Sequence, residues 1–401
     1  MLISRSQGLS RLQDFIKSGL VAYGSQRNHD LGAGYHQQNV SMLSPFLARR
    51  LLIESECINA ALSHHSGSVI SKWLDEVIWR IYWRGWLDHN PQIWSEYTLG
   101  LKRLCDDGHY EKANYVAAIR GNTGIASFDD WVTELKSTGY LHNHARMWFA
   151  SIWIFTLRLP WQLGAEFFLR HLLDGDAAVN TLSWRWVAGL HTKGKRYLAT
   201  AENIDRCTMG RVKVTERLAT QSEADSVAHL SLDTEIANIS AFQHFGSESF
   251  NAEKPSILII HPDDLLLEQS ELASANVTKI LAIDPHCPVI QSQFATLATH
   301  ALGQALKDGA ARAQTHFGVP ISWIKSDDLK TSLLEVQGPL VTMRPNRGLW
   351  FDLLTKACEH RPLSVVQRNL DAALFPYATK GFFSFREKVW ANPATGLTSP
   401  K

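Results

Sequence analysis

The sequence of 401 residues lacks most of the features that mark specialised classes of protein. Its longest apolar run covers residues 147–157, which is too short to cross a bilayer, and its first 20 residues have no apolar signal-peptide core. The five cysteines are scattered, with no CxxC pair and no metal-ligand spacing, so reduced thiols in a cytoplasmic protein are the simplest interpretation. A net charge of +1 gives no sign of a surface devoted to nucleic acid.

Tryptophan, in contrast, is abundant. Eleven of the 14 tryptophans lie between Trp73 and Trp186. Indoles are usually buried, so the cluster fits the core of a large domain, but it also fits a site that holds flat ligands. Neither interpretation follows from the count alone.

Residues 1–217 are predicted to form an all-α domain. Apolar residues recur at helical spacing, and almost nothing before residue 200 alternates as a half-buried strand does. Helices are predicted over residues 9–23, 44–52, 69–87, 128–136, 142–157, 161–173 and 177–190. The following stretch, 218–250, holds five acidic and no basic residues, so residues 218–254 are predicted to be an acidic linker.

Residues 255–401 are predicted to form an α/β doubly wound domain. Short apolar runs at 256–260, 279–283, 321–325, 340–343 and 363–367 are separated mostly by helical stretches such as 294–317 and 347–360. The first run is followed by His261-Pro262-Asp263-Asp264 instead of the G-x-G-x-x-G fingerprint of dinucleotide-binding proteins. The absence of this fingerprint leaves open a ligand at the switch point of the sheet.

Three segments of the helical domain, 73–80, 139–147 and 174–186, place charged or amide groups among indoles. Buried charges need partners, and Arg146 could pair with Asp174 or Asp176. A guanidinium beside carboxylates suits a polar heteroaromatic ligand, although an ordinary buried ion pair explains the same residues.

These three segments, together with Val40–Pro45, resemble the flavin-binding domain of the photolyase/cryptochrome family, and the resemblance runs from about residue 9 to residue 197. It implies a helical FAD-binding domain in which the turn at 40–45 cradles phosphate. The residues that it implies for FAD binding are Tyr23, Ser41, Met42, Leu43, Ser44, Trp73, Asn143, Arg146, Asp174, Asp176 and Asn180. Asp176 would accept from the flavin N3–H, and Asn180 would lie near flavin N5.

Within the family, the residues of the substrate pocket are most similar to those of cyclobutane pyrimidine dimer photolyases. The resemblance implies that a flipped dimer is bound by Glu76, Trp79, Arg80, Asn143, Met147 and Trp186. Stacking on an aromatic side chain contributes about 1–3 kcal/mol per base, which offsets part of the cost of flipping. The residues expected to take part in catalysis are Glu76, Asn143, Asn180, Trp161 and Trp184, with no metal ion.

The electron supply to the flavin departs from the family pattern. Trp184 and Trp161 stand where the family has the first two members of its photoreduction chain, but near His109 only Tyr110 and Tyr115 are present in place of a surface tryptophan. Electrons could reach the flavin through a tyrosine or through another indole such as Trp148 or Trp153, or the supply could be poor.

The order of the domains also departs from the family, whose α/β antenna domain precedes the helical one. The stretch from Tyr377 to Trp390 resembles the aromatic end of the antenna domain, which implies a circular permutation and a possible second antenna chromophore of unknown identity. An unrelated Rossmann-like domain is the alternative.

The function expected from the resemblance is light-driven repair of pyrimidine dimers in damaged DNA by electron transfer from reduced FAD. The alternatives are a cryptochrome-like blue-light photoreceptor without repair and a redox flavoprotein that needs no light. The protein is expected to be a cytoplasmic monomer that does not bind membranes.

Overall fold

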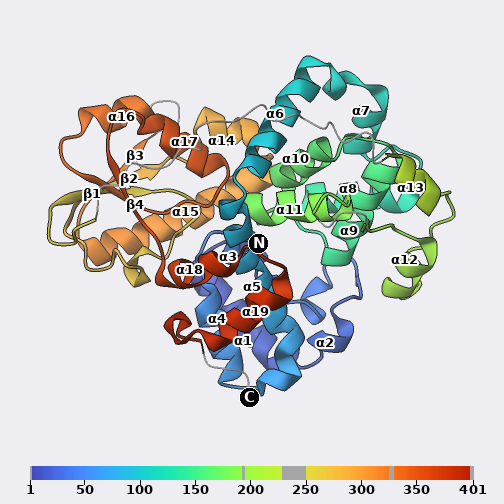
Figure 1. Ribbon diagram of the computed structural model, residues 1–401, viewed down its shortest axis with the longest axis horizontal. Coiled ribbons are helices and arrows are strands. Elements are labelled where there is room, and N and C mark those ends of the chain that lie inside the picture. Colours follow the sequence, from blue (N-terminus) through green and yellow to red (C-terminus); the bar gives the residue numbers. More distant parts are fainter. Residues whose placement is uncertain (1, 192–194, 228–249, 325–328, 398–401) are drawn as a thin grey trace.

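The computed structural model describes residues 2–191, 195–227, 250–324 and 329–397 (Figure 1). In the described residues before 228 every regular element is a helix. The α-helices of this helical region are α1 (Arg5–Ser18), α2 (Tyr23–Gln26), α3 (Ser44–Ala48), α4 (Glu54–Leu62), α5 (Gly67–His89), α6 (Gln92–Asp106), α7 (Ala113–Arg120), α8 (Ala126–Thr138), α9 (Asn143–Ser151), α10 (Trp161–His171), α11 (Ala177–Val187), α12 (Ala201–Cys207) and α13 (Gln221–Val227). Short 3-10 helices lie at His36–Gln38 (η1) and His109–Glu111 (η2).

The helix predicted over residues 142–157 is interrupted in the structure. After α9, the segment Ile152–Thr156 (η3) is a π-helix, whose wider turn changes the direction in which the following side chains project. Its residues Ile152, Trp153, Ile154 and Phe155 are all buried in the core of the helical region. The wider turn therefore buries these four side chains, and apolar periodicity alone does not predict a π-helix here.

The second region contains a parallel sheet of five strands in the order β3-β2-β1-β4-β5. The strands are β1 (Ser256–Ile260), β2 (Val277–Ile283), β3 (Ile321–Ile324), β4 (Leu340–Met343) and β5 (Leu363–Val366). The helices are α14 (Pro288–Gln293), α15 (Thr296–Phe317), α16 (Leu329–Glu335), α17 (Leu349–Ala357), α18 (Asn369–Leu374) and α19 (Phe382–Ala391), with 3-10 helices at Leu267–Gln269 (η5), Phe375–Tyr377 (η6) and Pro393–Thr395 (η7).

Helices cover both faces of this sheet because its strands alternate between two sets of apolar side chains. On one face, Ile257, Ile259 and Leu281 pack against Leu333 of α16 and Leu354 of α17. On the other face, the intervening residues of the same strands join the large core that includes α15 and the helical region. The predicted apolar runs thus correspond to strands that are buried from both sides.

The end of the chain packs back onto its beginning. In Figure 1, α18 and α19 (red) lie beside the long helix α5 (blue), and both helices contact it. α15 contacts α1 and α10, so the sheet region also touches the helical region directly. The two regions are therefore joined at several places.

All five predicted strands are present, and β1 and β4 have the predicted bounds. Each helical segment predicted by its range contains a helix, with ends that differ by a few residues and with the interruption in 142–157, whereas helices such as α2, α4, α6, α7 and α12 were not predicted. Residues 228–249 of the predicted linker lie outside the described residues, and the part before them forms α13. None of the helices in the described ranges combines the length and apolar composition that a membrane crossing requires.

Candidate functional site

A cavity of about 430 Å³ opens in the helical region, and all of its lining residues lie between Tyr23 and Val187. Three helices supply about half of the wall, and each contributes residues at positions i, i+3, i+4 and i+7. These are Glu76, Trp79, Arg80 and Trp83 of α5, Asn143, Arg146, Met147 and Ala150 of α9, and Asn180, Ser183, Trp184 and Val187 of α11. This spacing places four side chains on one face of a helix, so one face of each helix is turned toward the cavity.

The turn Val40–Ser44 closes one side of the cavity. Met42 has a φ of +50°, in the left-handed region that side chains other than glycine seldom enter, and Leu43 follows in a right-handed conformation. This alternation points successive backbone N–H groups to the same side, which is the arrangement that binds anions in nests. The turn predicted to cradle phosphate therefore has a suitable backbone.

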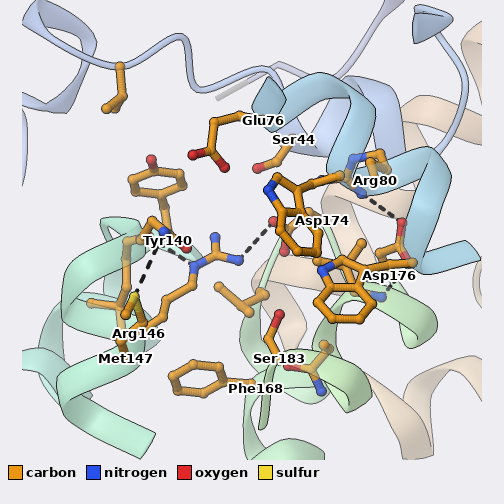
Figure 2. Close-up of a pocket in the computed structure, with 18 of the residues that line it drawn as sticks. Ser44, Glu76, Arg80, Tyr140, Arg146, Met147, Phe168, Asp174, Asp176 and Ser183 are labelled. Atoms are coloured by element: carbon orange, nitrogen blue, oxygen red, sulfur yellow. Dashed lines mark hydrogen bonds and ion pairs between the residues drawn. The ribbon is translucent and has the colours of Figure 1, made fainter. Parts of the chain in front are cut away.

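Arg146 and Asp174 form the ion pair that the sequence suggested, with Nη1 of Arg146 3.0 Å from Oδ2 of Asp174 (Figure 2). Burial would raise the pKa of Asp174, but Arg146, Arg80 and a hydrogen bond from Ser44 lower it by more, so the pKa lies below its usual range. Asp174 is thus a fixed negative charge, and it holds the partly exposed guanidinium of Arg146 at the cavity wall.

Asp176 has a different set of partners from the one expected. Its Oδ2 accepts hydrogen bonds from Nη1 of Arg80 at 2.6 Å and from Nη2 of Arg84 at 3.1 Å, while its Oδ1 caps α11 at the N–H of Val179. Arg84 is also bonded to the buried Glu54. Burial raises the pKa of Asp176, but the two guanidiniums outweigh it and the pKa is lowered.

Glu76 and Tyr23 both line the cavity, and the negative charge of Glu76 affects the pKa of Tyr23. Burial in the cavity wall raises the pKa of Glu76, and the positive charge of Arg27 opposes that shift. The pKa of Tyr23 is raised by its own burial and by the carboxylate of Glu76. A carboxyl group with a raised pKa can donate a hydrogen bond to a polar ligand when it is protonated.

The two asparagines of the site differ in how firmly they are held. Nδ2 of Asn180 donates to the carbonyl oxygen of Ala165 at 2.9 Å, which leaves Oδ1 of Asn180 to accept from an N–H of a ligand. Asn143 is exposed to the cavity, and its contact with Sδ of Met147 is 4.0 Å long. Asn180 is therefore oriented in advance, whereas Asn143 can adjust.

The two tryptophans predicted to stack on a damaged base are not equivalent. One face of Trp79 is covered by Phe382 of α19, with ring centroids 3.7 Å apart and planes within 4°. Trp186 is 36% exposed and lies 5.8 Å from Tyr197. Because Phe382 covers one face of Trp79, a ligand can contact only the rest of this side chain.

Trp73 is not among the residues that line the cavity. It is only 2% exposed and packs against Phe15, with centroids 6.1 Å apart. Trp73 precedes Glu76 by three residues and Arg80 by seven, so it lies on the same side of α5 as these cavity residues, two turns before Arg80. Its contact with a cofactor stays a prediction.

The two tryptophans predicted to carry electrons lie in different places. Trp184 is in the cavity wall and 2% exposed, and its Nε1 has no hydrogen-bond partner among the residues that the structure describes. Trp161, at the start of α10, is buried outside the lining and lies 5.8 Å from the ring of Tyr97.

Several lining residues are not among those predicted from the sequence; they include Arg27, Trp83, Tyr140, Phe168, Ser183 and Val187. A signal for three of them was available. Trp83, Ser183 and Val187 follow the predicted site residues Glu76 and Asn180 at i+7, i+3 and i+7 on the same helices. Phe168 comes from α10, and no spacing relates it to the other segments.

Comparison with known proteins agrees with this geometry. Residues 73–211 match the family described as the FAD binding domain of DNA photolyase. The deoxyribodipyrimidine photo-lyase of Escherichia coli is 28% identical over 199 residues, which are 49% of this chain and 41% of that protein. The protein of the same name from Thermus thermophilus is 32% identical over 189 residues, 47% of this chain and 43% of that protein. The chain matches less than half the length of these relatives.

Two solved structures overlap with the chain in part. A class III photolyase from Agrobacterium tumefaciens has a TM-score of 0.42 and 20% identity, covering 57% of this chain and 55% of its own. The cryptochrome of Synechocystis sp. PCC6803 has a TM-score of 0.42 and 22% identity, covering 51% and 43%.

Proposed function

Because this chain belongs to the photolyase/cryptochrome family, we propose that its helical cavity binds FAD and that the protein splits cyclobutane pyrimidine dimers in DNA under light. The observation that carries the proposal is the cavity itself. Its wall brings together the ion pair of Arg146 and Asp174, the anion-binding turn at Val40–Ser44 and the indole of Trp184.

The donor set of the cavity fits FAD. The backbone N–H groups of Ser41–Ser44 would hold the negative diphosphate, and Arg146 would face the isoalloxazine ring. Oδ1 of Asn180 would accept from a ring N–H. Asp176 already accepts hydrogen bonds from Arg80 and Arg84. To accept from the flavin N3–H as well, its carboxylate would need one more free lone pair, so this role stays a prediction.

Bound FAD, when reduced and excited by light, supplies the electron that splits a dimer. The residues of the chain bind and orient the dimer beside it. Trp186 and the open part of Trp79 would stack on the flipped bases, and Glu76, Asn143 and Met147 would line the rest of their site. Arg80 is committed to Asp176, so we assign it the task of holding that carboxylate rather than contacting DNA directly.

A photoreceptor that binds FAD without repair is the second candidate. The stacking of Phe382 on Trp79 favours it, because this contact reduces the aromatic surface open to a damaged base. The circular permutation and a second antenna chromophore stay predictions, since many α/β domains share this kind of strand order.

The test is repair of an oligonucleotide that contains one thymine dimer, with protein reduced chemically in the dark and then illuminated with blue light. We expect light-dependent restoration of undamaged thymines. Trp186→Ala should weaken binding to damaged DNA by about 1–3 kcal/mol, or roughly 5- to 150-fold, and leave binding to undamaged DNA unchanged. Tight FAD binding without repair would instead favour the photoreceptor.

A further inference from the structure

The short helix α3 connects the anion-binding turn of the cavity to the edge of the sheet. The turn Val40–Ser44 leads into α3, and Arg49 follows the helix at its other end. The backbone carbonyl of Arg49 accepts from the N–H of Leu265, in the segment after β1, at 3.1 Å. One short stretch of chain therefore reaches from the proposed FAD site to the sheet region.

The side chain of Arg49 is buried between the two regions, with 4% of its surface exposed. On the sheet side, its Nη1 forms an ion pair with Oδ1 of Asp263 at 3.6 Å. On the cavity side, a Cβ on Gly175 would lie 2.8 Å from Nη2 of Arg49 and 3.5 Å from Cε1 of Phe294 in the sheet region. The guanidinium thus lies between the carboxylate of Asp263 and the backbone of Gly175.

Gly175 connects the two carboxylates of the cavity wall, Asp174 and Asp176 (Figure 2). Its φ of +37° lies in the left-handed region, and Arg49 approaches its backbone too closely for a side chain to fit. Asp174 pairs with Arg146, and Asp176 caps α11. The position of Gly175 therefore decides where the cavity wall carries both of these charges.

Asp263 is itself fixed by the loops at the sheet edge. Its Oδ2 accepts from the N–H of Asn346, after β4, at 3.0 Å, and its own N–H donates to Nδ1 of His261 at 3.2 Å. Its Oδ1 is the oxygen that pairs with Arg49. The sheet edge therefore offers Arg49 an anchored carboxylate.

Carboxylates on both sides act on the charge of Arg49. Burial lowers the pKa of Arg49, and the largest opposing effect on this pKa comes from Asp263, followed by Asp176 and Asp174. Nε of Arg49 is buried and has no hydrogen-bond partner in the part of the chain that the structure describes. The guanidinium is therefore held by charge and by close packing between the sheet edge and the cavity wall.

We propose that Arg49 and Asp263 are positioning residues for the FAD site. Asp263, fixed at the sheet edge, holds Arg49, and Arg49 holds the segment 174–176 in the place that FAD binding requires. The proposal rests on the proposed function. Neither residue lines the cavity, so both act through this segment and not by contact with the cofactor. The sheet region thereby takes part in cofactor binding without a ligand of its own.

The first measurement needs no cofactor. Hydrogen exchange is followed by mass spectrometry in the FAD-free full-length protein, in a peptide that contains Val179, whose N–H donates to Oδ1 of Asp176 at 3.1 Å. Arg49→Met should speed exchange in this peptide, because the segment that carries Asp176 loses its support. Peptides from α8 should exchange as in the wild type, which separates local loosening from global unfolding. Unchanged exchange at Val179 would overturn the positioning role.

The second measurement is FAD affinity in a double-mutant cycle. Arg49→Met should weaken FAD binding about tenfold, and Asp263→Asn, which keeps an oxygen for the N–H of Asn346, should weaken it less. Because Asp263 acts through Arg49, adding Asp263→Asn to Arg49→Met should cause no further loss. Losses that simply add would overturn the proposal, since they would mean that the two residues act independently.

Matched variants separate positioning from general damage. Arg49→Met leaves Asp263 buried without this cation, so Arg49→Lys, which keeps the charge, is measured beside it and should bind FAD more tightly. Asp88→Asn is the control, because Asp88 pairs with Arg344 at 2.7 Å and also joins the two regions. It should leave FAD affinity and the exchange at Val179 unchanged. Equal weakening of FAD binding by Asp88→Asn would overturn the specific role of Arg49.

Failure of the positioning role and failure of the proposed function give different results. A wild type that does not bind FAD counts against the proposed function, and hydrogen exchange in the FAD-free protein then decides whether Arg49 holds the segment 174–176. A wild type that binds FAD, with Arg49→Met and Asp263→Asn equal to it in affinity, counts against the positioning role alone. Absence of repair by a protein that binds FAD counts against the repair function alone.

Discussion

The cavity of the helical region and the edge of the sheet differ in how accessible their charged side chains are to a ligand. In the helical region, Arg146 and Asp174 lie at the wall of an open cavity, where a ligand can reach them. At the carboxyl edge of the sheet, where doubly wound folds usually bind ligands, the charges are closed against one another. The comparison suggests that ligand chemistry is concentrated in the helical region and that the sheet edge supports it.

The closed edge follows directly from the residues after β1. Asp264 is bonded to Arg368 and to Arg50, and Arg50 is also bonded to Asp371. The neighbouring Asp263 accepts from the N–H of Asn346 in the loop after β4. These bonds occupy the charged groups that follow β1 and join them to Arg50 of the helical region.

The sheet edge meets the back of the cavity wall at Gly348, and it also reaches Gly175 indirectly, through Arg49 at the end of α3, whose guanidinium lies 3.6 Å from Asp263. A Cβ on Gly348, after β4, would come within 2.6 Å of Ala177, which follows Asp176 in the cavity wall. Gly175, between the two cavity carboxylates, has a φ of +37°, and a Cβ there would lie 2.8 Å from Arg49. Residues at the sheet edge therefore lie close behind the wall of the proposed flavin site.

The largest expected effect comes from breaking the closed edge. Asp264→Ala leaves Arg50 and Arg368 buried with one fewer carboxylate, so we expect a loss of about 3–5 kcal/mol in the free energy of unfolding, measured with urea. The control Glu359→Ala, which removes an exposed ion pair with Lys330, should change it by less than about 1 kcal/mol. Similar values for both variants would remove the contrast between a closed and an open set of charges.

The stabilisation by Asp264 should also depend on pH. Burial raises the pKa of Asp264, but Arg368 and Arg50 lower it to about 2. An ordinary Asp in the unfolded chain has a pKa of about 3.9, so the stabilisation is complete above about pH 4 and is lost as the pH falls toward 2. The difference between the wild type and Asp264→Asn should therefore shrink in acid, and a constant difference would contradict the pairing.

A smaller effect is expected in the open cavity. Arg146→Met removes the guanidinium proposed to face the flavin, and the loss of about 1.5–3 kcal/mol should weaken FAD binding by roughly 10- to 150-fold. Arg185→Met is the control, because Arg185 pairs with Glu96 away from the cavity lining. Binding is followed by the quenching of FAD fluorescence. Equal weakening in both variants would indicate a general loss of structure.

The smallest effect should come from Glu76. Its raised pKa means that the folded protein holds this proton more tightly than the unfolded chain, so stability falls as the pH rises from about 4 through the raised pKa. Glu76→Gln has no carboxyl proton to lose, so it should be more stable than the wild type at pH 8. The difference should be less than about 1 kcal/mol, because a charge beside the open cavity is screened by solvent. Urea unfolding at pH 4 and pH 8 checks the sign, and a variant that is less stable at pH 8 would contradict it.

The sequence predicted the sheet well because its strands are buried on both faces and appear as continuous apolar runs. β1 and β4 follow directly from such runs, with the predicted bounds. Part of the cavity was also predictable, since three helices present residues at helical spacing and the resemblance assigned them to one site. Arg146 and Asp174 illustrate this success.

Contacts between distant segments were not predictable from the sequence. Phe382 stacks on Trp79 across about three quarters of the chain, and no local pattern relates the two residues. The burial of Trp73 depends on its contact with Phe15 of α1, which no local pattern predicts. Apolar periodicity likewise does not predict the π-helix that contains Trp153, which lies against Trp184.

Titration of FAD into the purified full-length protein tests the central contrast most directly. One equivalent should bind with quenched fluorescence, and Arg146→Met should reduce this affinity, whereas Asn346→Ala at the sheet edge should leave it unchanged. Absence of binding, or binding that is unaffected by Arg146→Met and lost in Asn346→Ala, would contradict the assignment of ligand chemistry to the helical cavity.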